Sequence, residues 1–401
     1  MTAAEQRRAL TREEAVDRAV ELAPRIAARA DEHDRSATFA TADLEDLRAV
    51  GLLGLMAPTR LGGAGATFAD YVEVAMALAA GSGSTALVFN MHASVTGALA
   101  LTPDDVARSL GVPDSHFLMR DRVLASAVQG SLFVVAMSER AAGSRLSEMS
   151  TRYRRIDGGW QLTGSKAFCS GSTHADFFIV AARAQDDVGS PQVSQFLVPA
   201  GSEGLAVEQT WDPLGMRATA SNDVHLCDVV VPDDALLGGI EGLGVVLAQV
   251  MPQWLVASYA AVYVGIAQAA LDAGAQYIAQ RGLTALPAVR ARMGRADTAV
   301  AAAREVARAA AKRVDDAPGD PETNRWVWRS KLLAGETAMA VAASVLEACG
   351  TGATRRGNAL ERLYRDARCG SLQPATSDVC ADWLGAAALG LDPEQGPIAR
   401  W

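Results

Sequence analysis

The sequence predicts an α+β protein built in three consecutive parts. Three observations predict this order. Ala-rich amphipathic segments occupy residues 1–125, and short alternating runs of β-branched and aromatic residues occupy residues 126–240. Long Ala-rich segments with interleaved acidic and basic residues then occupy residues 241–401. Half of the 401 residues are apolar, which is enough for a large core.

The first part, residues 1–125, is expected to be a helical domain. The run from Thr11 to Glu14 is typical of a capping box, in which the threonine accepts hydrogen bonds from first-turn amides. Apolar residues recur at helical spacing in the segments after it. Helices are expected over 14–30, 41–52, from Thr67 onward and over 84–101, with a Gly-rich loop over 58–65.

The second part, residues 126–240, is expected to form a small β-barrel. Its apolar runs are only three or four residues long, and turn sequences such as Asp157-Gly-Gly159 separate them. Several short strands joined by polar turns are typical of a barrel or a sandwich. The expected strands cover 160–163, 177–180, 195–198, 223–226 and 229–231.

The third part, residues 241–401, is expected to be a four-helix bundle with helices near 242–281, 288–315, 322–349 and 375–390. No charged residue occurs from Gly242 to Leu271, but Pro252 and several polar residues interrupt this stretch. We therefore predict a fully buried helix rather than a membrane span, as in the middle of a homodimer or homotetramer.

Composition excludes several classes of function. The net charge of −9 and the pI of about 5.2 argue against a nucleic-acid binder, which normally has a basic surface. Five cysteines without a C-x-x-C pair, and no signal peptide, predict free thiols in a cytoplasmic protein. The five histidines are scattered without ligand spacing, so no metal site is expected.

Four motifs in order resemble the acyl-CoA dehydrogenase family over nearly the whole chain. They are Ser138-Glu-Arg-Ala-Ala-Gly-Ser144, Thr163-Gly-Ser-Lys-Ala-Phe-Cys-Ser170, Leu214-Gly-Met-Arg-Ala-Thr219 and Arg362-Leu-Tyr-Arg-Asp-Ala367. The resemblance implies the acyl-CoA dehydrogenase fold: an N-terminal helical domain, a central β-barrel and a C-terminal four-helix bundle.

The same resemblance implies a flavin cofactor, FAD. A flavin ring needs a flat stacking surface, hydrogen bonds at its pyrimidine edge and a donor near N5. By resemblance, Ser138 binds the pyrimidine edge, Phe168 stacks on the ring and Ser170 donates toward N5. Residues from a neighbouring subunit are expected to grip the phosphates. The expected cofactor-binding residues are Ser138, Ser144, Phe168, Cys169, Ser170, Arg281, Gly350, Thr351 and Thr376.

The catalytic base of the family is missing. Dehydrogenation of an acyl thioester needs a carboxylate to remove the α-proton while hydride passes to the flavin. The two places where the family carries that glutamate hold Pro374 and Trp254 here. If the chain is a dehydrogenase, Asp378 is the expected base, although an acidic residue at the N-cap or in the first turn of a helix is the more common case.

Three functions stay open. The first is α,β-dehydrogenation of an acyl thioester bound to CoA or a carrier protein, with an electron-transfer flavoprotein as electron partner. The second is a monooxygenase or N-hydroxylase on the same fold, which takes reduced flavin from a flavin reductase and needs no α-proton base. The third is a non-catalytic flavin-binding role.

Three residues are expected to line the substrate site. Arg145 lies in an Arg-rich stretch, 140–155, that suits a phosphorylated carrier or equally a solvated surface. His92 falls on the helix expected to line an acyl pocket, although a satisfied core histidine is the common case. Trp254 stands at the second of the two positions where the family carries its catalytic glutamate. We expect the thioester reaction, with the monooxygenase as the alternative.

Overall fold

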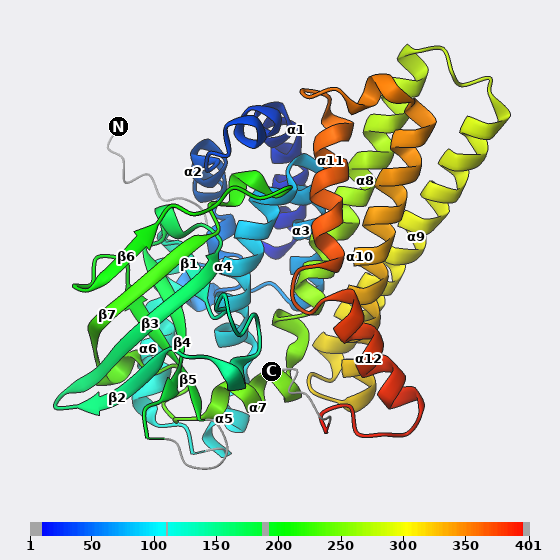
Figure 1. Ribbon diagram of the computed structural model, residues 1–401. Helices are drawn as coiled ribbons and strands as arrows, with labels where there is room; N and C mark the ends of the chain where they lie inside the picture. The colour runs from blue at the N-terminus through cyan, green and yellow to red at the C-terminus, as the bar shows by residue number, and fades with distance from the viewer. Residues whose placement is uncertain (1–9, 110, 187–191, 396–401) are drawn as a thin grey trace.

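The computed structural model describes residues 10–109, 111–186 and 192–395. The β-sheet lies on one side of the molecule and a bundle of long helices on the other, with the N-terminal helices between and behind them (Figure 1). The N-terminal helices are α1 (Arg12–Ser36), α2 (Thr41–Ala49), α3 (Phe68–Gly81), α4 (Gly83–Leu101), α5 (Asp104–Ser109) and α6 (Asp114–Val128).

Local sequence signals fix where these helices begin. The side chain of Thr11 accepts a hydrogen bond from the amide of Glu14, whose carboxylate accepts from the amide of Thr11, so the predicted capping box is confirmed. Thr67 and Asp70 form a second capping box at the start of α3. Helix α4 is buried along most of its length, which makes it the central element of the first part.

The middle of the chain forms a seven-stranded curled sheet of β1 (Phe133–Ala136), β2 (Arg152–Ile156), β3 (Gly159–Cys169), β4 (Phe177–Ala184), β5 (Val193–Pro199), β6 (Leu205–Glu208) and β7 (Asn222–Pro232). The strand order is β1-β4-β2-β3-β7-β6, with β5 on the other side of β4. Most ladders are antiparallel, but β4 is parallel to both β1 and β2. Within the described residues no ladder joins β5 to β6, so the barrel is open along that edge.

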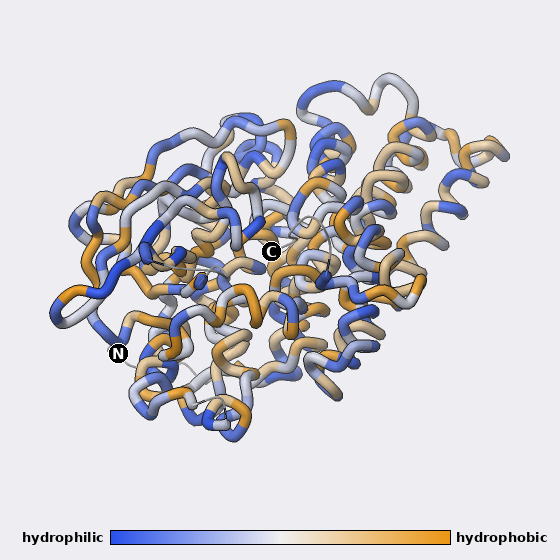
Figure 2. Tube along the Cα trace, turned by 60° about the horizontal axis from the view of Figure 1, so that its bottom comes forward, coloured by the Kyte–Doolittle hydropathy of each residue, from blue (hydrophilic) through white to orange (hydrophobic). Residues whose placement is uncertain are grey.

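The C-terminal part contains α7 (Leu243–Val250), α8 (Ala257–Gln280), α9 (Pro287–Asp316), α10 (Pro321–Cys349), α11 (Ala359–Arg368) and α12 (Ser377–Ala388). Helices α8 to α11 pack together as a bundle, with α12 against α10. Figure 2 shows hydrophobic and hydrophilic residues alternating along the bundle helices, as expected for helices with one buried face.

The uncharged stretch is two helices rather than one. Helix α7 ends at Val250, a short 3₁₀ turn follows over Pro252–Trp254, and α8 then runs through the core of a single chain. Three helices are long and apolar enough to cross a membrane, those within 83–101, 252–280 and 321–349, and the first two are mostly buried inside the protein. Because one chain already buries α8, this helix gives no evidence for an oligomer, which stays a prediction.

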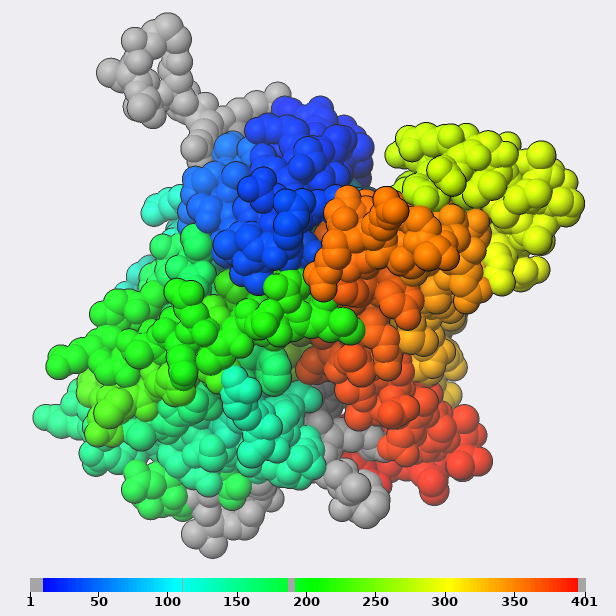
Figure 3. Space-filling model, turned by 45° about the horizontal axis from the view of Figure 1, so that its top comes forward, coloured from blue at the N-terminus to red at the C-terminus, as the bar shows by residue number. Residues whose placement is uncertain are grey.

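The Arg-Asp-Ala segment joins the three parts of the chain. Both guanidinium NH groups of Arg365 donate to the carboxylate of Asp34 in α1, at 2.9 and 2.6 Å, and Arg365 Nη1 also donates to the carbonyl of Leu214. The buried carboxylate of Asp366 accepts from the amide of Met216 at 2.6 Å. Figure 3 shows that the surfaces of three segments meet: α1, α11 and the segment that follows β6.

Candidate active site

The sheet brings two of the expected cofactor segments together. Strand β1 leads into Met137 and Ser138, and the carbonyl of Ser138 accepts a hydrogen bond from the amide of Ala167 at 2.9 Å. Ser138 is therefore held beside the end of β3, where Phe168 lies and which Ser170 follows. These three residues, expected to be cofactor residues from two motifs, form one cluster at the end of β3.

Phe168 has the geometry of a stacking residue. Phe168 is 54% exposed although its neighbours in β3, Ala167 and Cys169, are buried, and its backbone has a φ of +60°. A bulky residue in the left-handed region is strained by roughly 1–2 kcal/mol, and such strain concentrates at ligand sites. The ring of Trp211 approaches it edge-on, with 6.3 Å between centroids. One face of an aromatic ring is thus presented to solvent at a fixed angle.

Ser170 belongs to a buried chain of hydroxyl groups. Its Oγ lies 2.8 Å from Ser221 Oγ, which lies 2.6 Å from Thr219 Oγ1, and Thr219 Oγ1 donates to the carbonyl of Met216. Because Thr219 gives its single proton to Met216, Ser221 donates to Thr219 and Ser170 donates to Ser221. The Ser170 hydroxyl donates to a ligand only when it is released from Ser221.

A buried ion pair shapes the loop after Ser138. Glu139 accepts from the amides and hydroxyls of Ser150 and Thr151 and from Lys166 Nζ at 2.9 Å. Burial alone would raise the pKa of Glu139, but the Lys166 charge and these hydrogen bonds outweigh it and lower the pKa to about 2. The pair closes the turn from residue 138 to residue 151 against β3.

The side chains of Cys169 and Ser144, the other two cofactor residues expected in these segments, do not belong to the cluster. The Cys169 side chain is fully buried, and burial raises its thiol pKa to about 12. It faces the core of the sheet, because side chains alternate along β3, and only its backbone can reach the cluster. Ser144 is half-buried in the turn before the short 3₁₀ helix Leu146–Glu148.

The residues expected to hold the phosphates lie apart from this cluster in the single chain. Arg281 is the C-cap of α8, and Gly350 and Thr351 follow α10. All three residues are exposed, and they lie at the end of the bundle opposite α12 (Figure 1). A β-carbon added to Gly352 would lie 2.6 Å from the hydroxyl of Tyr277, which is one helical turn before Arg281. The end of α8 and the loop after α10 therefore lie side by side. Thr376 is the N-cap of α12 and accepts from the amide of Val379. Their cofactor roles stay predictions.

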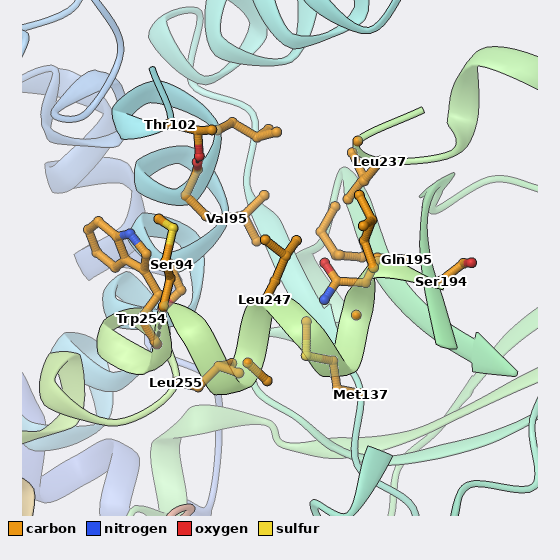
Figure 4. A pocket seen from close by; sticks show the side chains of 18 of the residues that line it. Ser94, Val95, Thr102, Met137, Ser194, Gln195, Leu237, Leu247, Trp254 and Leu255 are labelled. Carbon is orange, nitrogen blue, oxygen red and sulfur yellow. Dashed lines mark hydrogen bonds between the residues drawn. The ribbon is translucent and has the colours of Figure 1, made fainter. Parts of the chain in front are cut away.

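A cavity of about 190 Å³ adjoins the cluster at Met137 (Figure 4). Helices α4 and α7 and strands β1, β4 and β5 form its walls, with apolar side chains such as Val95, Ile179 and Leu247. No Asp, Glu, Lys or Arg is among the described residues that line it. The cavity is therefore a neutral, mainly apolar chamber beside the expected face of the flavin ring.

Trp254 lies on the wall of this cavity, as expected for a substrate-site residue. Its ring is 5% exposed and meets Phe68 edge-on, with 4.7 Å between centroids. Its carbonyl accepts hydrogen bonds from the hydroxyls of Ser94 and Ser258. Trp254 stands at the second position where the family carries its catalytic glutamate. Its packed indole ring forms part of the cavity wall and cannot accept a proton.

His92 is a core residue instead of the expected substrate contact. Its Nε2 lies 2.7 Å from the carbonyl of Leu53, and its Nδ1 accepts from the amide of Phe133 at 3.2 Å. Burial lowers its pKa to about 4, so the ring is neutral near pH 7. Both nitrogens serve the backbone, and His92 is not among the residues lining the cavity.

Arg145 and the basic stretch around it are balanced within the chain. Arg145 Nη2 lies 3.0 Å from the carboxylate of Glu148, and its Nε donates to the carbonyl of Ala142. Arg140 pairs with Asp223, and Arg155 with Asp233. The stretch is thus largely a solvated, paired surface, and the expected phosphate contact of Arg145 loses its main support.

Asp378 does not reach the cavity. It is exposed in the first turn of α12, and no residue of α12 is among those lining the cavity. An acidic residue there interacts favourably with the helix dipole. We therefore assign Asp378 to the start of the helix rather than to proton abstraction. The described residues also contain no group of three or more His, Cys, Asp or Glu that could hold a metal ion.

Comparisons with known proteins agree with this architecture. The family models for the acyl-CoA dehydrogenase N-terminal, middle and C-terminal domains match residues 10–103, 134–229 and 242–389. L-evernosamine nitrososynthase from Micromonospora sp. is 33% identical over 392 residues, which are 94% of this chain and 90% of that protein. The chain belongs to the acyl-CoA dehydrogenase superfamily. The predicted fold is confirmed, and the chain is a flavin-dependent oxidoreductase by family.

One further relative is a monooxygenase by name, and one similar solved structure holds FMN. Dibenzothiophene monooxygenase from Rhodococcus qingshengii is 29% identical over 389 residues, 90% of each protein. The solved structure of KijD3 in complex with FMN and a dTDP-linked amino-keto sugar has a TM-score of 0.84 at 28% identity, and the match covers 95% of this chain and 94% of that one.

Several site residues were not predicted from the sequence. Trp211, Thr219 and Ser221 lie in or beside the third motif, 214–219, and no sequence pattern offered a reason to assign them a role. The cavity residues of α7, such as Leu247, were missed because the uncharged stretch was taken as one buried helix. The break at Pro252 was the signal that could have separated α7 from α8.

Proposed function

We propose that this protein is a flavin-dependent monooxygenase that oxidises a small molecule bound in the cavity beside Met137. The ring of the flavin would pack on Phe168, with Ser138 at its pyrimidine edge and the hydroxyl of Ser170 near N5. These contacts concern the flavin ring, which FMN and FAD share. A bound reduced flavin would supply the electrons that activate O₂.

The observation that carries this proposal is the absence of any carboxylate among the described residues that line the cavity. Removal of an α-proton needs a base within hydrogen-bond reach of the α-carbon. Trp254 occupies one of the two expected places and Pro374 the other, and Asp378 lies outside the cavity. Oxygenation needs no such base, so these residues fit it without a compensating change.

The residues of this chain would then bind the substrate, orient it and keep water away. Val95, Leu247 and Trp254 would close an apolar chamber around it, and apolar walls of this kind limit unproductive loss of activated oxygen to water. The similarity to a nitrososynthase and to a dibenzothiophene monooxygenase supports the same proposal. As the electron partner we propose a separate flavin reductase.

Two measurements test this function on the flavin-loaded protein. Anaerobic mixing with a panel of acyl-CoA thioesters should leave the flavin absorbance unchanged, with an active butyryl-CoA dehydrogenase as the control for the thioesters. Mixing the reduced protein with ¹⁸O₂ and a panel of small apolar amines and ring compounds should give a product that contains ¹⁸O. Rapid bleaching by a thioester, without ¹⁸O incorporation from any compound, would refute the proposal.

A further inference from the structure

The polar side chains that line the cavity fall into two groups. Three of them are satisfied by the protein. The Ser94 hydroxyl donates to the carbonyls of Asn90 and Trp254, the Thr102 hydroxyl donates to Ala98, and Ser194 Oγ accepts from the amide of Gly242 while it donates to the Tyr153 hydroxyl. The other three, Gln195, His116 and Trp254, retain hydrogen-bonding groups without a partner among the described residues; for Trp254 this group is the indole N–H.

Gln195 lies in β5 and presents its amide to the cavity. The side chain is half-buried, and none of the described residues makes a hydrogen bond to the amide group. Figure 4 shows the amide pointing toward Leu247, whereas the neighbouring Ser194 points away. The amide can therefore both donate to and accept from a ligand in the cavity.

His116 offers one further donor. Its Nδ1 accepts a hydrogen bond from the amide of Gly238 at 3.2 Å. Burial is the largest effect on its pKa and lowers it from the ordinary value, which favours the neutral ring. The single proton of that ring must then be on Nε2, for which the described residues provide no hydrogen-bond acceptor.

A second hollow meets the cavity at His116. It has a volume of about 220 Å³, and three carboxylates and one guanidinium line it. Arg155 pairs with Asp233, Asp234 pairs with Arg122, and Glu241 accepts from the hydroxyl of Tyr153. These charged groups are therefore partnered within the protein. The lining residues with charge are Arg155, Asp233, Asp234 and Glu241.

The size of the cavity limits the ligand further. Its volume of about 190 Å³ is somewhat larger than an apolar cavity of about 150 Å³ that binds benzene. A ligand of one or two fused rings therefore fits without rearrangement of the walls, while a longer chain would have to extend outside.

We propose that the cavity binds a neutral, compact, largely apolar molecule of one or two rings, whose single polar group is held by the Gln195 amide and His116 Nε2–H. Gln195 is thus the specificity-determining residue of the site. This inference rests on the proposed function only in that the bound molecule is the one oxidised. A carboxylate placed inside the cavity would lack a counter-charge, because no Lys or Arg is among the described residues that line it.

Equilibrium binding to the flavin-loaded, oxidised protein tests this without any turnover. The probes are 2-naphthol, naphthalene and 2-naphthoate, which share one ring system and differ in one group. We expect 2-naphthol to bind at least tenfold more tightly than naphthalene, and 2-naphthoate not to bind measurably. Gln195→Leu should weaken 2-naphthol about tenfold and leave naphthalene unchanged. Thr102→Val, which removes an already satisfied hydroxyl from the same cavity, is the matched control and should change neither affinity.

The outcomes separate this inference from the proposed function. Tighter binding of 2-naphthoate or butyryl-CoA than of 2-naphthol would overturn the inference, as would equal losses in Gln195→Leu and Thr102→Val. If 2-naphthol binds as expected but no probe incorporates ¹⁸O, binding specificity is as inferred while the monooxygenase proposal is not supported. If ¹⁸O enters a charged substrate instead, the monooxygenase stands and the inference fails.

Discussion

The indole ring of Trp254 lies directly against the backbone of Gly97: a β-carbon added to Gly97 would be 2.1 Å from Cζ2 of Trp254. Gly97 is in the last third of α4, and Trp254 is in the turn between α7 and α8. The close approach therefore joins the N-terminal and C-terminal parts at the wall of the cavity. It is possible only without a side chain at residue 97.

Gly97→Ala should therefore disturb both packing and the cavity. Overpacking of a buried site typically costs about 1–3 kcal/mol, which exceeds the gain of about 1 kcal/mol for alanine in a helix. Denaturant unfolding should show this loss, and 2-naphthol binding should weaken as Trp254 moves. Gly294→Ala in α9 is the control, because an added β-carbon there meets nothing within 4 Å. If both variants gain stability, the contact with Trp254 is not tight.

The Glu139–Lys166 pair should be essential to the fold of the loop that presents Ser138. Glu139→Gln leaves the Lys166 ammonium buried without its counter-charge, and breaking such a pair typically costs about 3–5 kcal/mol. Unfolding by urea measures this loss. The double variant Glu139→Gln with Lys166→Met removes both charges and should regain a substantial part of it. A double variant no more stable than the single one would mean that the hydrogen bonds to Ser150 and Thr151 matter more than the charges.

The sequence was sufficient for the order of the three parts, and the family resemblance of two motifs singled out Ser138, Phe168 and Ser170, which the structure brings together at the end of β3. The sequence was not sufficient for the surroundings of His92 or Arg145. Whether a histidine on an apolar helix faces a cavity or the core depends on the rotation of that helix, here set by the packing of α4 against β1. The Gln195 amide and the partners of Arg145 depend in the same way on residues distant in sequence.

The pH dependence of stability should reveal the buried His92. Its folded-state pKa of about 4 lies below the ordinary value of 6.5, so the unfolded chain binds more protons between these values. Stability should therefore be fully present above pH 6.5 and decline as the pH falls toward 4, by on the order of 3 kcal/mol from this group. His92→Gln keeps one donor and one acceptor but does not titrate. The difference in unfolding free energy between wild type and variant should change across this window, and a constant difference would contradict the assignment.

Ser170→Ala should alter the bound flavin while the fold stays intact. The change removes one hydroxyl from the Ser170–Ser221–Thr219 chain, and a lost hydrogen bond to a ligand typically costs about 1–3 kcal/mol. The reduction potential and dissociation constant of the flavin are the measurements. Ser165→Ala, on the same strand but exposed and bonded to His225, is the control. Unchanged flavin properties in Ser170→Ala would remove this residue from the cofactor site.

Asp378→Asn decides between the two reactions that the sequence left open. If Asp378 were the base of a dehydrogenase, its loss would lower turnover by about 10²–10⁴-fold with little change in binding. The structure places Asp378 on the exposed first turn of α12, away from the cavity. We therefore expect unchanged oxygenation and, from the weaker interaction with the helix dipole, a stability loss of only about 0.3–1 kcal/mol. Thr376→Ala, which removes the N-cap of the same helix, should cost more, about 0.5–2 kcal/mol, because a capping hydrogen bond is lost. A variant Asp378→Asn that is as stable as expected but inactive would restore the carboxylate to the reaction and the thioester dehydrogenase to first place.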